Sequence, residues 1–398
     1  MSLNNTPSSE RLHIGIFGKR NAGKSSLINA ITGQSLAIVS DVKGTTTDPV
    51  SKAMELLPLG PVVMIDTPGL DDEGDLGAMR VSKAYQVLNK TDIALLVIDG
   101  TEENSDENQA LLERIKDKKI PYLIVINKAE SVEIPKEVPE DTIYVSALNG
   151  INIHELKERI GQLVPSEEKK RDLVADLIEP LDFVVLVVPI DSSAPKGRLI
   201  LPQQQVIRDV LETGAVSIVV KDTELKETLE KLQTKPKLVI TDSQVFKEVS
   251  DIVPEDIELT SFSVLFARYK GNLWEAVKGA RAIETLEDGD KILIAEGCTH
   301  HRQCEDIGTV KMPRWIKEYT KKDIQFEFCS GTEFPQDLSS YKMIVHCGGC
   351  TLNEREMKYR IRCSVDQEIP ITNYGIFIAY MKGILERSIA PLQKAEEK

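Results

Sequence analysis

Residues 18–25 read Gly-Lys-Arg-Asn-Ala-Gly-Lys-Ser, after an apolar run, Leu12–Phe17, and before a stretch typical of a helix, Ser26–Ile31. A glycine-rich segment that follows a strand and opens a helix has the context of a phosphate-binding loop. Its two glycines let backbone N–H groups point at phosphates, and the helix N-terminus adds partial positive charge. We therefore predict a nucleotide site in which Lys24 reaches the β- and γ-phosphates and Ser25 binds Mg²⁺.

Residues 11 to about 165 alternate between apolar runs and polar stretches typical of helices. This alternation predicts βαβ units, and so a mostly parallel sheet with helices on both faces. The further strands predicted here are Val62–Ile65, Ile93–Ile98, Tyr122–Ile126 and Ile143–Val145, and the last helix is Ile153–Leu163.

Three more short motifs each follow a predicted strand. In Asp66–Gly69, the aspartate is placed to hold Mg²⁺ through water and the glycine N–H to sense the γ-phosphate. In Asn127–Glu130, the carboxylate can accept both N–H donors of a guanine edge. Ser146–Leu148 can support the base with a backbone N–H. Because parallel sheets bind ligands at this edge, the ordered set predicts a GTP site.

This region resembles the GTPase domains of translation-factor type, in particular the tRNA-modification and ribosome-assembly GTPases. Those proteins use an asparagine in the phosphate loop to help bind K⁺, and Asn21 occupies that place. Leu70 stands where Ras-like proteins carry a catalytic glutamine. Gly44–Asp48 resembles switch I, with Thr46 as the implied Mg²⁺ ligand. Glu130 departs from the usual aspartate, with the same acceptor atoms on a side chain one methylene longer.

The predicted nucleotide-binding residues are Asn21, Ala22, Gly23, Lys24, Ser25, Ser26, Thr46, Asp66, Gly69, Asn127, Lys128, Glu130, Ser146 and Ala147. Ser25 and Thr46 are the predicted Mg²⁺ ligands, with GTP as substrate. Lys24 and, through K⁺, Asn21 are the predicted catalytic residues, because a bound cation would supply the positive charge that an arginine finger gives elsewhere.

The rest of the chain predicts two smaller α/β domains after a charged linker at Pro165–Asp172. The first has short apolar strands and no catalytic constellation, and we expect it to form a homodimer interface. We place the GTPase domain at 1–168, the dimerisation domain at 169–265 and a third domain at 266–398. The predicted strands are Phe183–Val188, Ser217–Val220, Leu238–Ile240, Lys291–Ala295, Ile324–Phe328, Lys342–Val345 and Ile369–Thr372. The predicted helical stretches are Gln203–Glu212, Glu224–Gln233, Gln244–Ser250 and Ser261–Leu286, the last with weak points at Gly271 and Gly279.

Composition narrows the functional classes. The 398 residues include 49 Lys and Arg against 63 Asp and Glu, for a net charge of −14. This balance argues against general affinity for nucleic acid or acidic membranes, which needs a basic face. The first ten residues are polar and the longest apolar runs are far shorter than the ~20 residues of a membrane span. We expect a cytoplasmic protein without membrane or nucleic-acid partners.

All six cysteines lie in the last quarter or so of the chain, in an arrangement that suggests metal or redox chemistry. Cys298-Thr299-His300 follows one predicted strand, and His346-Cys347-Gly348-Gly349-Cys350 follows another. Three interpretations remain open on spacing alone. A structural zinc would use three cysteines and a histidine, a redox dithiol would use Cys347 and Cys350, and an iron–sulfur cluster would use all three motif cysteines.

Cys-x-His followed far downstream by His-Cys-x-x-Cys, behind a GTPase domain, resembles the [FeFe]-hydrogenase maturation GTPases, the HydF family. The resemblance covers nearly the whole chain. It implies a [4Fe–4S] cluster on Cys298, Cys347 and Cys350. It also implies a scaffold or carrier role for the di-iron precursor of the hydrogenase active site, with the apo-hydrogenase and radical-SAM maturation enzymes as partners. Candidates for the fourth iron ligand are His300, His346, Glu305, His301 or solvent.

The remaining cysteines, Cys304, Cys329 and Cys363, are interpreted as free thiols that are at least partly buried. The main alternative for the whole chain is an RNA- or ribosome-acting GTPase with a zinc or redox domain at its C-terminal end. The acidic net charge weighs against that alternative.

Overall fold

The structure is a computed structural model that describes residues 6–33, 49–57, 59–69, 81, 83–102, 105–164, 172–190, 199–297, 306–331 and 333–396. It divides into two compact units, Met1–Glu168 and Lys169–Lys398. No helix in the described ranges has the length and apolar character needed to cross a membrane.

The first unit is built on a six-stranded sheet in the order β2-β3-β1-β4-β5-β6. Only β2 runs antiparallel to its neighbour, and the other pairs are parallel. The strands are β1 (Leu12–Phe17), β2 (Val50–Leu56), β3 (Gly60–Asp66), β4 (Ile93–Asp99), β5 (Tyr122–Asn127) and β6 (Thr142–Tyr144). The predicted mostly parallel sheet of a P-loop GTPase is therefore confirmed.

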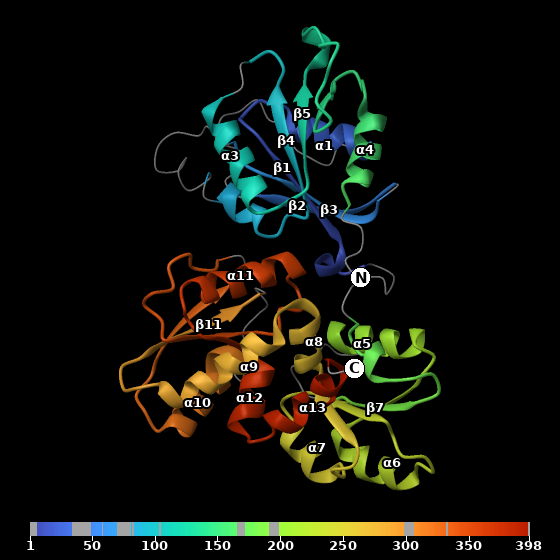
Figure 1. The fold of residues 1–398 in the computed structure, drawn as a ribbon, viewed down its shortest axis with the longest axis vertical. Coiled ribbons are helices and arrows are strands. Elements are labelled where there is room, and N and C mark those ends of the chain that lie inside the picture. The colour runs from blue at the N-terminus through green and yellow to red at the C-terminus, as the bar shows by residue number, and fades with distance from the viewer. Residues whose placement is uncertain are drawn as a thin grey trace. The chain divides into compact units, whose positions relative to one another are not determined.

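Helices cover both faces of this sheet. Figure 1 shows α1 (Lys24–Thr32) and α4 (Ile153–Gln162) on one side of the strands and α3 (Asp106–Asp117) on the other. Two separate apolar clusters fill these interfaces, one under α1 and α4 and one under α3 and the helical segment 83–88. A parallel sheet with helices on both faces requires strands and helices to alternate along the chain, as the sequence predicts.

The sequence analysis missed β2. Most of its residues are exposed or half-buried, and only Leu56 is buried. An edge strand with so little apolar burial has no apolar run by which it could be predicted.

The second unit contains two all-parallel sheets. The first has the order β10-β9-β7-β8. Its elements are β7 (Phe183–Val187), α5 (Leu201–Glu212), β8 (Val216–Val220), α6 (Leu225–Lys231), β9 (Leu238–Thr241), α7 (Phe246–Ile252) and β10 (Glu258–Ser261). The predicted strands and helices of this region are confirmed, and the short, partly polar β10 is an addition to them.

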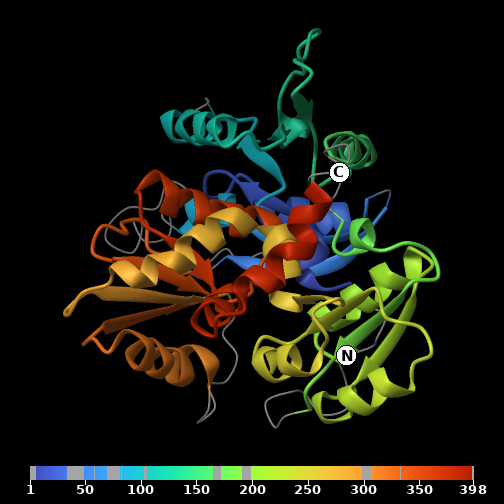
Figure 2. The ribbon, with the colours of Figure 1, turned by 60° about the horizontal axis from the view of Figure 1, so that its bottom comes forward.

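The second sheet of this unit has the order β12-β11-β13-β14. Its elements are β11 (Lys291–Glu296), α10 (Met312–Thr320), β12 (Gln325–Ser330), β13 (Met343–His346), α11 (Glu354–Asp366) and β14 (Ile371–Asn373). Two helices follow in the chain, α12 (Tyr374–Met381) and α13 (Leu385–Glu396), and α13 packs against β10 of the first sheet. Figure 2 shows α10 and α11 on opposite faces of these strands. This arrangement agrees with the division of the apolar residues into two clusters.

The helical stretch predicted at 261–286 forms two helices, α8 (Phe262–Lys270) and α9 (Leu273–Arg281), and they are separated at Gly271, one of its two predicted weak points. The chain breaks at Gly271, and the side chain of Asn272 caps α9 by accepting a hydrogen bond from the N–H of Glu275 at 3.3 Å. Asparagine is among the preferred N-cap residues, so the local sequence favours this break.

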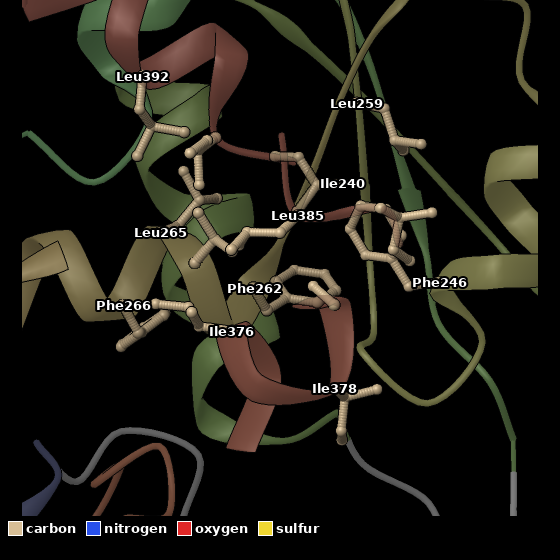
Figure 3. Packing of buried hydrophobic residues seen from close by; sticks show 14 of the residues in the cluster. Ile240, Phe246, Leu259, Phe262, Leu265, Phe266, Ile376, Ile378, Leu385 and Leu392 are labelled. Atoms are coloured by element: carbon tan, nitrogen blue, oxygen red, sulfur yellow. The ribbon is translucent and has the colours of Figure 1, made fainter. Parts of the chain in front are cut away.

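One continuous core joins the two sheets of the second unit. It runs from Leu173 to Leu392 and includes residues of β7, β9, β11, β13 and the helices between and after them. Figure 3 shows its central part, where Phe262 and Leu265 of α8 lie among side chains from α7, α12 and α13. The predicted boundary between residues 265 and 266 falls inside α8.

Candidate functional site

The phosphate-binding loop has the backbone shape that the sequence predicts. Gly18 and Gly23 both have positive φ angles, of 143° and 87°. A Cβ atom at Gly18 would overlap the Val97 carbonyl oxygen, and one at Gly23 would overlap the Asn127 amide. Only glycine fits at both positions, because each combines a positive φ with a close neighbour. Gly23 then caps the N-terminus of α1.

Lys24 and Ser25 begin α1 and face the end of β3. The buried Lys24 ammonium donates to the carbonyl oxygens of Gly18 at 2.9 Å and Lys19 at 2.6 Å. The Ser25 hydroxyl donates to Asp66 Oδ2 at 2.6 Å. Burial raises the pKa of Asp66, and the Ser25 hydrogen bond and the Lys24 charge oppose that rise.

Asp66 also carries a buried oxygen, Oδ1, that has no hydrogen-bond partner among the described residues. A buried carboxylate oxygen without a partner is costly unless a cation or water satisfies it. Together with the neighbouring hydroxyl of Ser25, this oxygen fits the hard-oxygen environment that Mg²⁺ prefers.

The guanine-reading loop is tied directly to the phosphate loop. The buried Asn127 side chain donates from Nδ2 to the Ala22 carbonyl at 3.0 Å, and its Oδ1 accepts the N–H of Ala147 at 3.1 Å. One amide therefore joins three predicted motifs. The Ser146 hydroxyl, fully buried, accepts the N–H of Asn149 at 3.0 Å and closes the last loop.

An ion pair that was not predicted from the sequence holds Lys128, the residue after Asn127. Lys128 has a positive φ of 62° and its ammonium pairs with the buried Asp99 at the end of β4. Burial alone would raise the pKa of Asp99, but hydrogen bonds from Lys128 and Thr101 outweigh it and hold the pKa below its ordinary value. The sequence offered one sign of this ion pair. Asp99 is an acidic residue directly after the predicted strand Ile93–Ile98, which no recognised motif follows.

The other predicted nucleotide residues lie around this loop. Asn21 is exposed with a positive φ of 59°, Ser26 is half-buried in α1, Gly69 follows β3, and Glu130 is exposed in a short 3₁₀ turn after β5. Thr46, Leu70 and the rest of the predicted switch I motif lie outside the described residues.

The cysteine loop follows β13. Cys347 donates its N–H to the Ala295 carbonyl at 2.8 Å, which continues the parallel pairing with β11. Its Sγ accepts the N–H of Gly297 at 3.0 Å and that of Gly349 at 3.4 Å. Gly297 directly precedes Cys298, so the described backbone brings the start of the first cysteine motif to the second. Two N–H donors aimed at a sulfur stabilise it as a thiolate, the form that binds metals.

Lys270, the last residue of α8, lies beneath this loop. Its buried ammonium donates to the carbonyl oxygens of Cys350 and Leu352, both at 3.4 Å. Burial raises the pKa of the Cys350 thiol; Cys347 adds to that rise, and the charge of Lys270 opposes it. A small pocket, partly open to solvent, lies beside Lys270, Cys347 and Gly348.

His346 is the last residue of β13 and is only 1% exposed. Its Nδ1 lies 2.7 Å from the Cys347 carbonyl oxygen, and its Nε2 lies 3.0 Å from Nη1 of Arg360 on α11. Arg360 is itself fully buried, donates from Nε to Glu356 Oε1 at 2.9 Å, and donates to the Gly331 carbonyl. The sequence analysis missed Arg360, because it lies in an ordinary amphipathic helix outside any motif.

The remaining members of the predicted cluster site are only partly described. Cys298, His300, His301, Cys304 and Glu305 lie outside the described residues. Within the described ranges, no group of three or more histidine, cysteine or acidic side chains is arranged to hold a metal ion. Cys329 and Cys363 are half-buried and form no disulfide bond with the described residues.

Sequence models of protein families match three consecutive stretches of the chain. The model of a 50S ribosome-binding GTPase matches residues 13–128. The hydrogen maturase F dimerization domain matches residues 173–271, and the hydrogen maturase F tetramerization domain matches residues 274–391. The GTPase fold and the presence of oligomerisation domains therefore hold for this chain.

Several known GTPases are similar to parts of the chain. The tRNA modification GTPase MnmE of Legionella pneumophila is 38% identical over 159 residues, which cover 39% of this chain and 35% of that protein. GTPase Der of Mycoplasmopsis pulmonis is 32% identical over 200 residues, which cover 45% and 46%. The structure of Aquifex aeolicus Era matches with a TM-score of 0.36 and 23% identity, over 52% of this chain and 92% of Era. The chain thus spans between a third and a half of the two relatives' length.

Hydrogen maturase F models match residues 173–271 and 274–391, and these two models together cover more than half of the chain. They follow a GTPase domain in which hydrogen bonds join the phosphate-binding loop to Asp66 and to Asn127, at the ends of two strands. The chain belongs to the HydF family of hydrogenase maturation GTPases.

Proposed function

We propose that this protein binds a [4Fe–4S] cluster through Cys298, Cys347 and Cys350 and serves as a GTP-hydrolysing scaffold for the di-iron precursor of the hydrogenase active site. The observation that carries the proposal is the contact of Cys347 Sγ with the N–H of Gly297, the residue before Cys298. Gly297, the last described residue before the first cysteine motif, thereby lies against a cysteine of the second motif, almost fifty residues further along the chain.

The donor set fits iron–sulfur iron. Thiolates are the soft ligands that such clusters take, and the N–H groups that point at Cys347 are of the kind that tune cluster potentials. When bound, the cluster would supply an iron site at which cargo could dock. The chain's own contribution is to aim two backbone N–H groups at the Cys347 sulfur and to place the Lys270 ammonium, a positive charge, close to Cys350.

Anaerobic reconstitution with iron and sulfide tests this proposal. We expect wild type to give the visible and EPR spectra of a four-iron cluster. Cys298→Ala, Cys347→Ala and Cys350→Ala should each lose most of the bound iron. Cys363→Ala is the matched control, because this half-buried thiol lies on α11 outside the loop, and it should retain full iron content. A colourless zinc protein, or equal iron in all variants, would contradict the proposal.

We also propose that K⁺ stimulates GTP hydrolysis through Asn21. This residue is exposed in the phosphate loop, in a left-handed conformation that asparagine tolerates. Hydrolysis by wild type should be faster in K⁺ than in Na⁺ at equal ionic strength, and Asn21→Ala should remove the difference. Equal rates of wild type in the two salts would contradict this part.

The partners proposed are the apo-hydrogenase and the radical-SAM maturation enzymes, and the assembly is proposed to be at least a homodimer in the cytoplasm. Matches to dimerization and tetramerization domains support the self-association. An RNA- or ribosome-acting role is the second candidate, because the GTPase unit matches a ribosome-binding GTPase model. Co-purification of the tagged protein with ribosomal particles, rather than with the maturation enzymes, would favour it.

A further inference from the structure

We infer that His346 is not an iron ligand but a hydrogen-bond relay, through which Arg360 positions the backbone of Cys347. This inference deepens the proposed function and rests on it, since it concerns the same cysteine loop. It also narrows the candidates for the fourth iron site.

The hydrogen bonds fix the state of the imidazole ring. A guanidinium has only donors, so His346 Nε2, 3.0 Å from Arg360 Nη1, must be the acceptor. In a neutral ring the proton then lies on Nδ1, which donates to the Cys347 carbonyl oxygen at 2.7 Å. Both ring nitrogens are therefore used within the protein, and neither lone pair remains for iron.

Arg360 is held rigidly enough to impose this arrangement. Its guanidinium is fully buried, is paired with the buried Glu356, donates to the Gly331 carbonyl, and lies 5.1 Å from the centre of the Phe334 ring. A charge buried in this way is costly to move, because any displacement breaks several charge-assisted hydrogen bonds. Turning His346 toward a metal would leave one guanidinium N–H without its partner.

The relay acts on the loop that carries the cysteines. The carbonyl that His346 holds belongs to Cys347, whose sulfur accepts two backbone N–H groups. Fixing the Cys347–Gly348 peptide limits how the tight glycine turn to Cys350 can rotate. His346 and Arg360 are thus positioning residues for a thiolate rather than members of a ligand set.

The first test uses apo protein labelled with ¹⁵N in its histidine rings. The chain has five histidines, and the His346 signals are identified by their loss in His346→Gln. NMR of wild type should show His346 protonated on Nδ1 only. Arg360→Lys, which keeps the charge but not the guanidinium fork, should give a mixture of tautomers. Arg362→Lys, exposed on the same helix, is the matched control and should leave the signals unchanged. A proton on Nε2 in wild type would overturn the inference.

The second test uses reconstituted protein and separates this inference from the proposed function. Pulsed EPR of the reduced cluster should show the same nitrogen couplings in wild type and His346→Gln; a coupling that disappears in the variant would overturn the inference. A chelator should remove iron several-fold faster from Arg360→Lys than from Arg362→Lys. If wild type takes up no cluster, the proposed function fails, but NMR of the apo protein still tests whether His346 is protonated on Nδ1. If Arg360→Lys does not fold, the comparison of wild type with His346→Gln still tests the inference.

Discussion

At the scale of single residues, the specificity of the nucleotide site depends on side chains whose partners lie far away in the sequence. Asn127 joins the phosphate loop to the loop of Ala147, and Asp99 fixes Lys128. Glu130 lies next to this network on an exposed turn, so its longer side chain has room to adjust to a base.

We predict that Glu130→Ala lowers GTP affinity at least tenfold and removes most of the preference for GTP over ATP. Hydrogen bonds to a charged group contribute about 1.5–3 kcal/mol, and ATP lacks the two donors that the carboxylate would read. Glu130→Asp should keep the preference. Competition titrations with a fluorescent GTP analogue measure both effects. An unchanged preference in Glu130→Ala would mean that another group reads the base.

We predict that His13 on β1 makes the free energy of unfolding of the first unit depend on pH. Burial lowers its pKa to about 4 from 6.5; the hydrogen bond with the Arg11 carbonyl opposes that shift and the Lys90 charge adds to it. As the pH falls, His13 is therefore protonated at a higher pH in the unfolded chain than in the folded one. The free energy of unfolding should fall as the pH drops from about 6.5 toward 4, by about 2 kcal/mol at pH 5.

Thermal unfolding of the GTPase unit measures this effect. His13→Asn should lose less stability than wild type between pH 7 and pH 5. His154→Asn, on the exposed face of α4, is the control and should behave as wild type. Parallel pH curves for wild type and His13→Asn would contradict the assignment.

At the scale of helices and strands, the packing of α9 against β14 depends on one glycine. A Cβ atom at Gly279 would overlap the carbonyl group of Ile371, which is backbone and cannot turn aside. Glycine is a poor helix former, but α9 carries it at this position because the helix approaches β14 closely.

We predict that Gly279→Ala destabilises the second unit by about 1–3 kcal/mol, although alanine is the better helix former. Lys278→Ala is the neighbouring control, because its side chain is 80% exposed, and it should stay within about 0.5 kcal/mol of wild type. Chemical denaturation followed by circular dichroism compares the two. A stabilised Gly279→Ala would show that α9 can shift away from β14 at little cost.

Whether a helix or strand could be predicted from the sequence depended on how regular its local pattern is. Buried parallel strands such as β4 and β11 were found because they form apolar runs, and the phosphate loop because its glycines have a fixed spacing. The exposed edge strand β2 gave no such run. Arg360 and Lys270 were missed because their importance comes from tertiary contacts with the cysteine loop, which a helical pattern does not reveal.

At the scale of the whole molecule, the nucleotide site and the cysteine loop belong to separate compact units. We predict that Lys24→Ala abolishes GTP hydrolysis and leaves the iron content after reconstitution unchanged. Phosphate release and iron assays on the same preparation measure both. Loss of iron from a folded Lys24→Ala protein would mean that the cysteine loop depends on the GTPase unit for its structure.

The helix α13 completes the sheet that begins the second unit. Arg387 donates to the carbonyl oxygens of Ser250 and Val253, and Thr260 of β10 donates to the Ser388 carbonyl at 2.8 Å. During synthesis on the ribosome, β7 to β10 therefore emerge long before the helix that covers them. Domains made in one stretch can fold while translation continues. This sheet must instead wait, with apolar surface exposed, until more than a hundred further residues have been added. The domain that matches the dimerization model and the loop proposed to hold the cluster should therefore complete their packing only after α13 has been translated. We expect nascent chains not to associate through a finished middle sheet before that point.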